Sequence, residues 1–324
     1  MSQEQDRAFE QLFRHAAPRP HPPLEIEREV KAALLEEWDA VAGRRVRWRR
    51  TGFVAAAVAL IAVTVGVLLN VGVAPDAVVV ARVERVSGEV TSGDERSPNR
   101  LVLGGVVTSG AIVSTGQGQI ALRLSDGGSL RLAPGTRLTM VSARETDVAT
   151  GMLYFDSERG TAAPAATQVV VRTPAGIVRD VGTQFLVRLD GDRLDVGVRD
   201  GQVALTHSDG IANAGAGERL IVDVRSDRLQ RGSIDSVGAE WEWAEALAPP
   251  YEIEGSRLSD FLDWVAAQTG RNVAYVDANA EAIARQTTLR GSIDLDPMSK
   301  LAAVLATTDL TYTLEGATIL IGVK

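Results

Sequence analysis

One stretch of the chain, Thr51 to Pro75, carries no Asp, Glu, Lys or Arg side chain and predicts a helix that crosses a membrane. At about 1.5 Å per residue, such a helix spans the roughly 30 Å hydrocarbon core of a bilayer. Five arginines precede it: Arg44, Arg45, Arg47, Arg49 and Arg50. Because arginines beside a span tend to stay in the cytoplasm, we predict a single-pass protein with residues 1–50 inside and the chain from Asp76 onward outside. The alternative, a cleaved signal peptide, usually has an apolar core of only about 7–15 residues near the start of the chain.

Residues 1–50 predict a short helical segment made of two helices. Prolines between positions 18 and 23 separate the helices, because proline lacks an amide donor and disfavours helix at the residue before it. In the second helix, apolar side chains recur at spacings of three and four and form one stripe. Its principal members are Ile26, Val30, Leu34 and Trp38. The stripe is either a docking face for a partner or part of a lightly ordered membrane-proximal tail.

Between residues 76 and 235 the apolar positions alternate with polar ones, which predicts strands. Ile120, Leu122 and Leu124 illustrate the alternation. Turns rich in aspartate and glycine separate such runs, at residues 126–128, 190–192 and 200–201. Many short strands joined by turns of this kind predict an all-β domain, either a sandwich or a solenoid-like roll.

The last segment, residues 236–324, predicts a small α+β domain. One helix has an apolar face that includes Leu258 and Phe261, and Gly270 ends it in a left-handed conformation. A second helix begins at Asp296 as the cap and Pro297 as the first helical residue. Strands are predicted at residues 272–276, 287–293, 311–314 and 317–323.

Composition narrows the classes of function. The chain has 324 residues, no cysteine, three histidines and a net charge of −8. Without cysteine there is neither a disulfide nor a thiolate zinc site, and we expect no metal and no cofactor. Residues 1–50 hold ten basic and nine acidic side chains, whereas the rest holds 24 and 33. This acidic outer part argues against direct binding of nucleic acid.

Two further groups of residues have a structural interpretation. Arg179 and Asp180 are adjacent, and we expect them to form an exposed ion pair rather than a binding site. Trp241, Trp243 and Trp264 are expected to pack the junction between the β-domain and the last domain, with an exposed patch for a partner as the alternative.

The stretch VRTPAGIVRDVGTQF at residues 171–185, followed by LDVGVRDGQV at residues 194–203, resembles the core of the FecR-type domain. The motifs LSDGGS at residues 124–129 and GAGER at residues 215–219 fit the same family in order and spacing. Members are single-pass inner-membrane regulators of extracytoplasmic-function sigma factors in Gram-negative bacteria. The resemblance covers roughly residues 85–230 and implies a periplasmic FecR-type domain at residues 76–235.

The segment LSDFLDWVAAQTGRNV at residues 258–273, with Leu289-Arg290-Gly291 after it, resembles the short N-terminal (STN) domain of secretins and TonB-dependent receptors. The resemblance implies an STN-like signalling module at residues 236–324. Its implied partner is the signalling domain of a TonB-dependent outer-membrane receptor, and the candidate contact residues are Phe261, Trp264 and Leu289.

Together the resemblances imply a transmembrane relay. A receptor contacts the periplasmic domains, and residues 1–50 hold or assist a sigma factor in the cytoplasm, with regulated proteolysis as the route of the signal. Family members commonly carry a longer cytoplasmic domain than these fifty residues. A membrane-anchored periplasmic scaffold or glycan-binding envelope protein without a sigma partner is the alternative.

Gly182-Thr183 is the one candidate for chemistry. A threonine hydroxyl can attack the carbonyl before it when the backbone is strained, and glycine tolerates such strain. The resulting ester is hydrolysed, so the chain cuts itself once without turnover, as the resemblance also implies. The structural alternative is that Gly182 forms a bulge and Thr183 fills a β-position.

Overall fold

The structure is a computed structural model that describes residues 78–94, 96–157, 168–180, 182–223, 225–226 and 228–324. The chain divides into two compact units, Met1–Ala74 and Pro75–Lys324, and the described residues all belong to the second. Within the described ranges, no helix combines the length and the apolar character that crossing a membrane requires. The predicted span at residues 51–75 and the helices of residues 1–50 lie outside the described residues.

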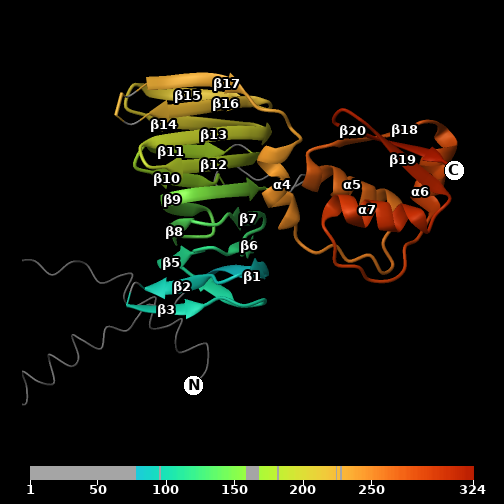
Figure 1. Ribbon diagram of the computed structural model, residues 1–324, viewed down its shortest axis with the longest axis horizontal. Helices are drawn as coiled ribbons and strands as arrows, with labels where there is room; N and C mark the ends of the chain where they lie inside the picture. The colour runs from blue at the N-terminus through green and yellow to red at the C-terminus, as the bar shows by residue number, and fades with distance from the viewer. Residues whose placement is uncertain (1–77, 95, 158–167, 181, 224, 227) are drawn as a thin grey trace, which may run out of the picture. The chain divides into compact units, whose positions relative to one another are not determined.

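Residues 79–233 form strands stacked from β1–β3 at one end to β15–β17 at the other (Figure 1). The strands are β1 Val79–Ser87, β2 Thr91–Asp94, β3 Ser97–Arg100, β4 Val106–Thr108, β5 Ala111–Ser114, β6 Gln119–Leu124, β7 Ser129–Leu132, β8 Arg137–Met140, β9 Glu145–Asp156, β10 Val170–Thr173, β11 Gly176–Asp180, β12 Gln184–Asp190, β13 Arg193–Asp200, β14 Gln202–His207, β15 Gly210–Gly215, β16 Glu218–Asp223 and β17 Arg228–Ser233. The prediction of an all-β domain is confirmed.

The strands form two layers that share β9. The first layer has the order β4-β1-β6-β7-β9-β12-β13-β16-β17, and the second β3-β2-β5-β8-β9-β10-β11-β14-β15. From β1 to β17 the chain advances along the stack by passing from one layer to the other, mostly after each hairpin. Of the two predicted architectures, this order corresponds to the solenoid-like one.

The crossing of β9 from one layer to the other depends on Gly151. Residues 145–150 pair with β8 and β10, and residues 151–156 pair with β7 and β12. Gly151 has a φ of 100°, and a Cβ placed on it would lie 2.3 Å from Cα of Thr136. A side chain is therefore excluded here on two grounds, backbone conformation and space.

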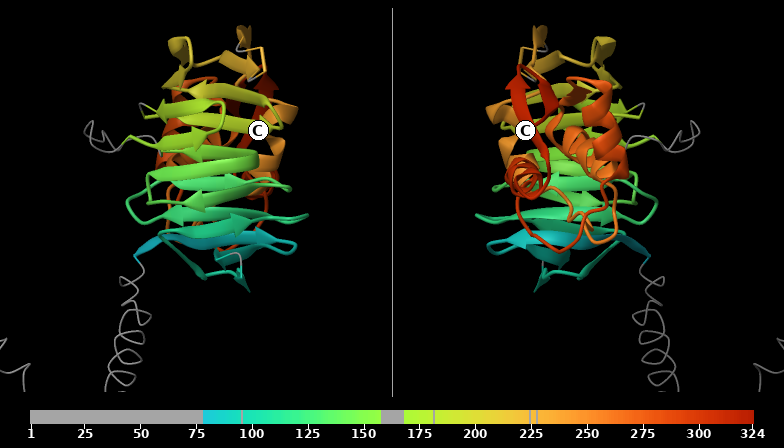
Figure 2. Two further views of the ribbon diagram at one scale, coloured as in Figure 1. Left: turned by 90° about the vertical axis from the view of Figure 1, so that its left-hand side faces the viewer. Right: turned by 90° about the vertical axis from the view of Figure 1, so that its right-hand side faces the viewer.

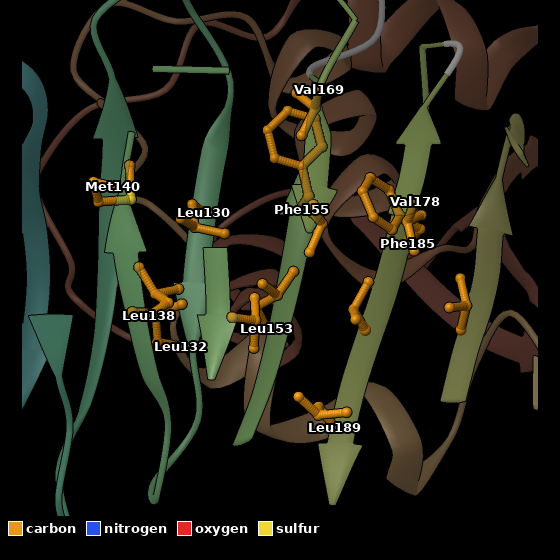
Figure 3. Packing of buried hydrophobic residues seen from close by; sticks show 14 of the residues in the cluster. Leu130, Leu132, Leu138, Met140, Leu153, Phe155, Val169, Val178, Phe185 and Leu189 are labelled. Atoms are coloured by element: carbon orange, nitrogen blue, oxygen red, sulfur yellow. The ribbon is translucent and has the colours of Figure 1, made fainter. Parts of the chain in front are cut away.

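Inward-facing side chains of both layers form one hydrophobic core. Leu138 and Met140 contribute from the second layer, and Leu130, Phe155 and Phe185 from the first (Figure 3). The rings of Phe155 and Phe185 are in contact, with centroids 5.6 Å apart. This core explains the alternation in the sequence, because successive residues of a strand point to opposite faces.

Four helices and a three-stranded sheet follow the β-domain (Figure 1). They are α4 Ala239–Ala246, α5 Leu258–Thr269, β18 Asn272–Tyr275, α6 Ala278–Gln286, α7 Pro297–Ala306, β19 Leu310–Glu315 and β20 Thr318–Val323. The sheet has the order β18-β20-β19. From α5 onward these elements pack around a core of their own, which includes Phe261, Leu262, Leu301 and Ile319.

Both predicted helix signals are confirmed. Gly270 caps α5 with a φ of 63°, and the Asp296 side chain accepts a hydrogen bond from the Ser299 amide at the start of α7. The predicted strand at residues 287–293 is wrong, because this segment makes only an isolated bridge between Thr288 and Arg257. Helices α4 and α6 were not predicted.

Candidate functional site

Gly182 and Thr183 lie where the chain passes from β11 in the second layer to β12 in the first. Gly182 has a φ of 70° and is exposed, whereas Thr183 is only 1% exposed. Gly201 faces this link so closely that a Cβ on it would lie 2.6 Å from the carbonyl oxygen of Gly182. The peptide between Gly182 and Thr183 therefore joins a surface glycine in a left-handed conformation to a buried threonine.

The hydroxyl of Thr183 donates a hydrogen bond to the carboxylate of Asp180, with Oγ1 3.1 Å from Oδ2. The other carboxylate oxygen of Asp180 accepts the amide of Val169 at 2.7 Å. Asp180 is buried, so the prediction of an exposed Arg179–Asp180 pair is wrong. Arg179 instead reaches Thr206, with Nη1 3.3 Å from Oγ1. The sequence-based prediction missed Asp180 as part of this site.

These groups include the hydroxyl, the carboxylate and the carbonyl that an N-to-O acyl shift would use. Asp180 is placed to take the hydroxyl proton as Thr183 Oγ1 bonds to the carbonyl carbon of Gly182. The C–N bond then breaks, the nitrogen receives a proton, and an ester remains that water hydrolyses to two chain ends. The same contacts also suit the structural interpretation, because they satisfy a buried hydroxyl and a buried carboxylate.

Gln184, the next residue, connects this link to the last domain. Its side-chain amide donates to Oδ2 of Asp156 at 3.1 Å and to the backbone carbonyl of Ala267 in α5 at 2.9 Å. The amide of Ser157 donates to the carbonyl of Thr183 at 3.1 Å. The peptide that follows the candidate cleavage bond is therefore held by contacts that include the C-terminal end of α5.

Two buried arginines from the first layer hold the ends of α4 and α5. Arg131 in β7 donates to the carbonyl of Ala244 at 2.6 Å and to the side-chain oxygen of Gln268. It lies over the ring of Tyr154, 5.0 Å from the centroid, and 3.9 Å from Asp156. Cations at the C-terminal ends of helices are favoured by the free carbonyls and the helix dipole.

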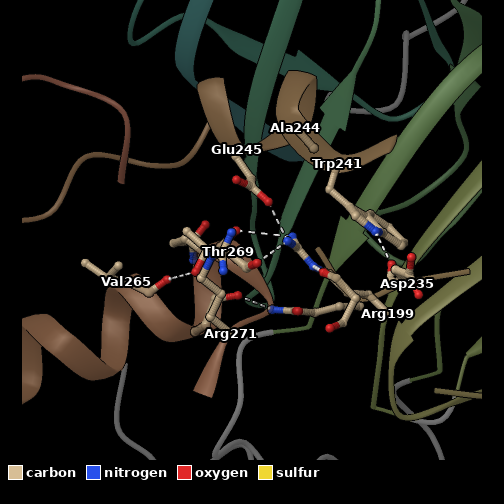
Figure 4. Close-up of polar contacts among 12 residues, drawn as sticks. Arg199, Asp235, Trp241, Ala244, Glu245, Val265, Thr269 and Arg271 are labelled. Atoms are coloured by element: carbon tan, nitrogen blue, oxygen red, sulfur yellow. Dashed lines mark hydrogen bonds and ion pairs between the residues drawn. The ribbon is translucent and has the colours of Figure 1, made fainter. Parts of the chain in front are cut away.

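Arg199 in β13 makes the larger set of contacts (Figure 4). It donates to the carbonyls of Ser236 at 2.7 Å, Gln268 at 3.2 Å and Thr269. It also pairs with Glu245 at 2.5 Å. Its guanidinium lies 5.0 Å from the ring centroid of Trp241. One side chain of the β-domain thus contacts both helices and the segment that leads into α4.

Burial dominates the electrostatics of this junction. It lowers the pKa of Arg131, although Tyr154 and Asp156 act in the opposite direction. It also raises the pKa of Glu245, more than the attraction of Arg199 lowers it. Burial thus disfavours the charged form of both groups, while the contacts of Arg131 and Arg199 favour it.

The three tryptophans have different surroundings. Trp241 is fully buried against Tyr154, Leu186 and Ile234 and donates from its ring nitrogen to the carbonyl of Asp235 at 2.7 Å. Trp243 packs against the same cluster. Both therefore occupy the junction as predicted, whereas Trp264 packs on the core of the last domain.

The structure separates the three predicted receptor contacts. Phe261 is 0% exposed and Leu289 is also buried, so both are core residues and neither side chain is open to a partner. Trp264 is partly buried and lines a groove of about 650 Å³ together with Tyr251, Asp263 and Val273. The ring of Tyr251 lies 5.1 Å from that of Trp264. Of the three, only Trp264 is placed for direct contact.

The remaining predicted sites lie outside the described residues. They are the cytoplasmic stripe of Ile26, Val30, Leu34 and Trp38, and the arginines Arg44, Arg45, Arg47, Arg49 and Arg50.

Comparison with known proteins identifies one domain. The model of the family described as FecR protein matches residues 111–204, which run from β5 into β14 and include Asp180, Thr183 and Arg199. Two similar crystal structures are of a candidate anti-sigma factor from Parabacteroides distasonis. Both are 18% identical in sequence, with TM-scores of 0.35 and 0.36, covering 66% and 65% of this chain and 98% and 97% of the other. None of the curated proteins compared with the chain matches it. Residues 111–204 are thus a FecR domain, which confirms the resemblance to the FecR-type domain for this part of the chain.

Proposed function

We propose that this chain is a single-pass inner-membrane regulator of an extracytoplasmic-function sigma factor. The FecR domain at residues 111–204 is the observation that carries the proposal. The predicted span at residues 51–75 would put this domain in the periplasm and residues 1–50 in the cytoplasm. There the stripe of Ile26, Val30, Leu34 and Trp38 would dock the sigma factor.

The signal enters through the last domain, which we propose to be an STN-like module that binds the signalling domain of a TonB-dependent receptor. The groove beside Trp264 supports this role, because aromatic and polar side chains of the module line it together with Arg123 and Asp156 of the β-domain. Gln184 supports a route inward, since it bonds α5 and directly follows Thr183. A partner that moved α5 would therefore release Gln184 at the start of β12, next to Thr183.

We further propose that the chain cuts itself between Gly182 and Thr183. The hydrogen bond from Thr183 to Asp180 supports this reaction, as does the positive φ of Gly182. Thr183 is the nucleophile and Asp180 the base. The reaction occurs once per chain and gives two fragments that remain held together by the pairing of β12 with β9 and of β14 with β11.

Cleavage is tested on the full chain with a tag at each end, expressed in a Gram-negative bacterium and followed by denaturing electrophoresis and N-terminal sequencing. We expect a C-terminal fragment that begins at Thr183. Thr183→Ala should abolish it, Asp180→Asn should slow its formation at least tenfold, and Thr183→Ser should retain it. Thr146→Ala, at a buried threonine of the same domain, is the control. An intact wild-type chain, or a cut that persists in Thr183→Ala, would contradict self-cleavage.

Sigma binding needs a separate test. The tagged full chain is purified from membranes of the source bacterium, and captured proteins are identified by mass spectrometry. We expect a sigma factor with the wild type, its loss with Trp38→Ala, and its retention with the control Trp48→Ala, outside the stripe. Capture of envelope components without any sigma factor would favour the scaffold alternative.

A further inference from the structure

Large apolar side chains gather at the end of the stack that is formed by β3 and β4. These two strands are the outermost of the second and the first layer. The exposed side chains at this end are Val78, Val79, Val102, Leu103 and Val106, which we call the β3–β4 end patch. Leu103 is 71% exposed and Val78 is 66% exposed.

The patch is more than scattered surface residues. Half of the large hydrophobic side chains that stand exposed in the described ranges belong to it. At the opposite end, among the described residues of β14–β17, Ile211 is the one large apolar side chain that is exposed. Single exposed apolar residues are common, but a gathered set marks a surface that meets a partner or a membrane.

Local contacts hold the patch in place. The amide of Ser109 donates to the carbonyl of Val78 at 2.8 Å, which fixes Val78 beside β4. The guanidinium of Arg82 donates to the carbonyl of Gly104 at 2.9 Å and so braces the loop that carries Leu103. These bonds fix the backbone that carries Val78 and Leu103. Figure 2 shows the strands at this end of the stack from two sides.

Charge at this end is mixed. Arg96 and Arg100 are exposed on the β2–β3 hairpin, and Asp94 is exposed there too, where its carboxylate accepts the amide of Arg96. The arginines suit lipid phosphates, but the apolar side chains dominate the surface. Apolar side chains flanked by a few arginines suit the boundary between lipid headgroups and acyl chains better than they suit the surface of an acidic protein.

We propose that the β3–β4 end patch rests on the periplasmic face of the membrane, with Leu103 at the level of the lipid headgroups. The inference rests on the proposed span, which ends at Pro75, three residues before Val78. Three extended residues reach at most about 11 Å. The β3–β4 end is therefore tied close to the bilayer surface, and burying its apolar side chains there is favourable.

The chain has no cysteine, so single labels can be placed on the full-length protein. Leu103→Cys reports the patch, Ile211→Cys the opposite end, and Leu60→Cys the proposed span. Each variant is labelled with an environment-sensitive dye and reconstituted into vesicles of phosphatidylethanolamine and phosphatidylglycerol. The vesicles carry a spin-labelled lipid as quencher, with the label near the headgroup for Leu103→Cys and Ile211→Cys and deep in the acyl chain for Leu60→Cys. We expect the dye at Leu103→Cys to be quenched at least threefold more than the dye at Ile211→Cys.

The three labelled positions distinguish a wrong membrane contact from a wrong span. If Leu60→Cys is quenched and Leu103→Cys behaves like Ile211→Cys, the span stands and the membrane contact is wrong. If Leu60→Cys is also unquenched, the proposed span fails and the inference falls with it. A blue-shifted but unquenched dye at Leu103→Cys would show that protein, such as a second copy of the chain, covers the patch, and would also overturn the proposal.

Discussion

Replacing Arg199 by methionine tests whether the buried contacts at the junction stabilise the unit Pro75–Lys324. Arg199 donates to three backbone carbonyls and pairs with Glu245. Its side chain is fully buried, and that of Glu245 is 18% exposed. Methionine has a similar volume and an apolar side chain that reaches about as far as Nε of arginine, but it offers no donor, so the variant removes the polar contacts.

The expected loss of stability follows from leaving Glu245 in place without its partner. Removing one member of a buried ion pair costs about 3–5 kcal/mol, because the remaining charge is left unpaired and desolvated. The partial exposure of Glu245 places the value near the lower limit, so we expect the free energy of unfolding to fall by about 3 kcal/mol. Burial already raises the pKa of Glu245. The double variant Arg199→Met/Glu245→Gln should therefore recover about 1 kcal/mol of the loss, since a neutral amide costs less to bury.

The assay is urea unfolding of the full chain in detergent, followed by tryptophan fluorescence. Trp241 lies 5.0 Å from the guanidinium and reports the junction directly. Arg225→Met is the control, because Arg225 pairs with Asp192 at the surface with 84% of its side chain exposed. A loss below about 1 kcal/mol for Arg199→Met, equal to the control, would refute the view that this contact set stabilises the junction.

Two further predictions concern the β-domain. Gly151→Ala should lower the free energy of unfolding by about 3 kcal/mol or more, because the new methyl group meets the backbone of Thr136 at a positive φ. Gly232→Ala, where nothing lies within 4 Å and no positive φ is required, is the matched control, and equal urea midpoints would contradict the reasoning. Burial raises the pKa of Asp195 despite the nearby Arg219. The folded state therefore binds this proton more tightly, and the stability it contributes is present below the pKa of the unfolded state and lost as pH rises through the folded pKa. Asp195→Asn should make the free energy of unfolding depend less on pH from about pH 4 upward. The free energy is measured by urea unfolding at several pH values, and the same pH dependence in the variant and the wild type would contradict this.

Much of the fold was predictable from local signals. Alternation, glycine-containing turns, the cap at Gly270 and the start of α7 at Asp296 act over a few residues, so the sequence shows them directly. The missed helix α6 also had such a signal, since Asp277 caps it through the amide of Ala280. Its alanines gave only a weak apolar face, because they contribute little hydrophobic surface.

Two features of the β-domain have tertiary causes. In β9 the core-facing positions change from even to odd, with Val148 before Gly151 and Leu153 after it, because the strand changes layer. In β13 the face opposite the core is also buried, because α4 and the segment before it cover it. A Cβ on Gly197 would lie 2.7 Å from Cδ1 of Ile234. Neither effect is visible in a window of neighbouring residues.

The candidate site was only half predictable for the same reason. Gly182-Thr183 was found from its motif, whereas Asp180 was expected at the surface because aspartate is seldom buried. Its burial depends on the amide of Val169, eleven residues earlier. The partners of Arg131 and Arg199 at the ends of α4 and α5 are 46 to 137 residues away in the chain. Arginines in strands show their role only when the packed helices are present.

Gln184 is the residue through which the last domain could act on the candidate cleavage site in the proposed relay. A single membrane helix transmits little by bending, so a signal from the last domain needs a target close to where that domain is held. Gln184 bonds the carbonyl of Ala267 near the C-terminal end of α5, and Arg199 binds those of Gln268 and Thr269. Displacing α5 would release Gln184 while the hydrogen bond from Thr183 to Asp180, which lies wholly within the β-domain, stays formed. Self-cleavage would then precede and not require the receptor, and the receptor's contribution would be to loosen β12 after the cut.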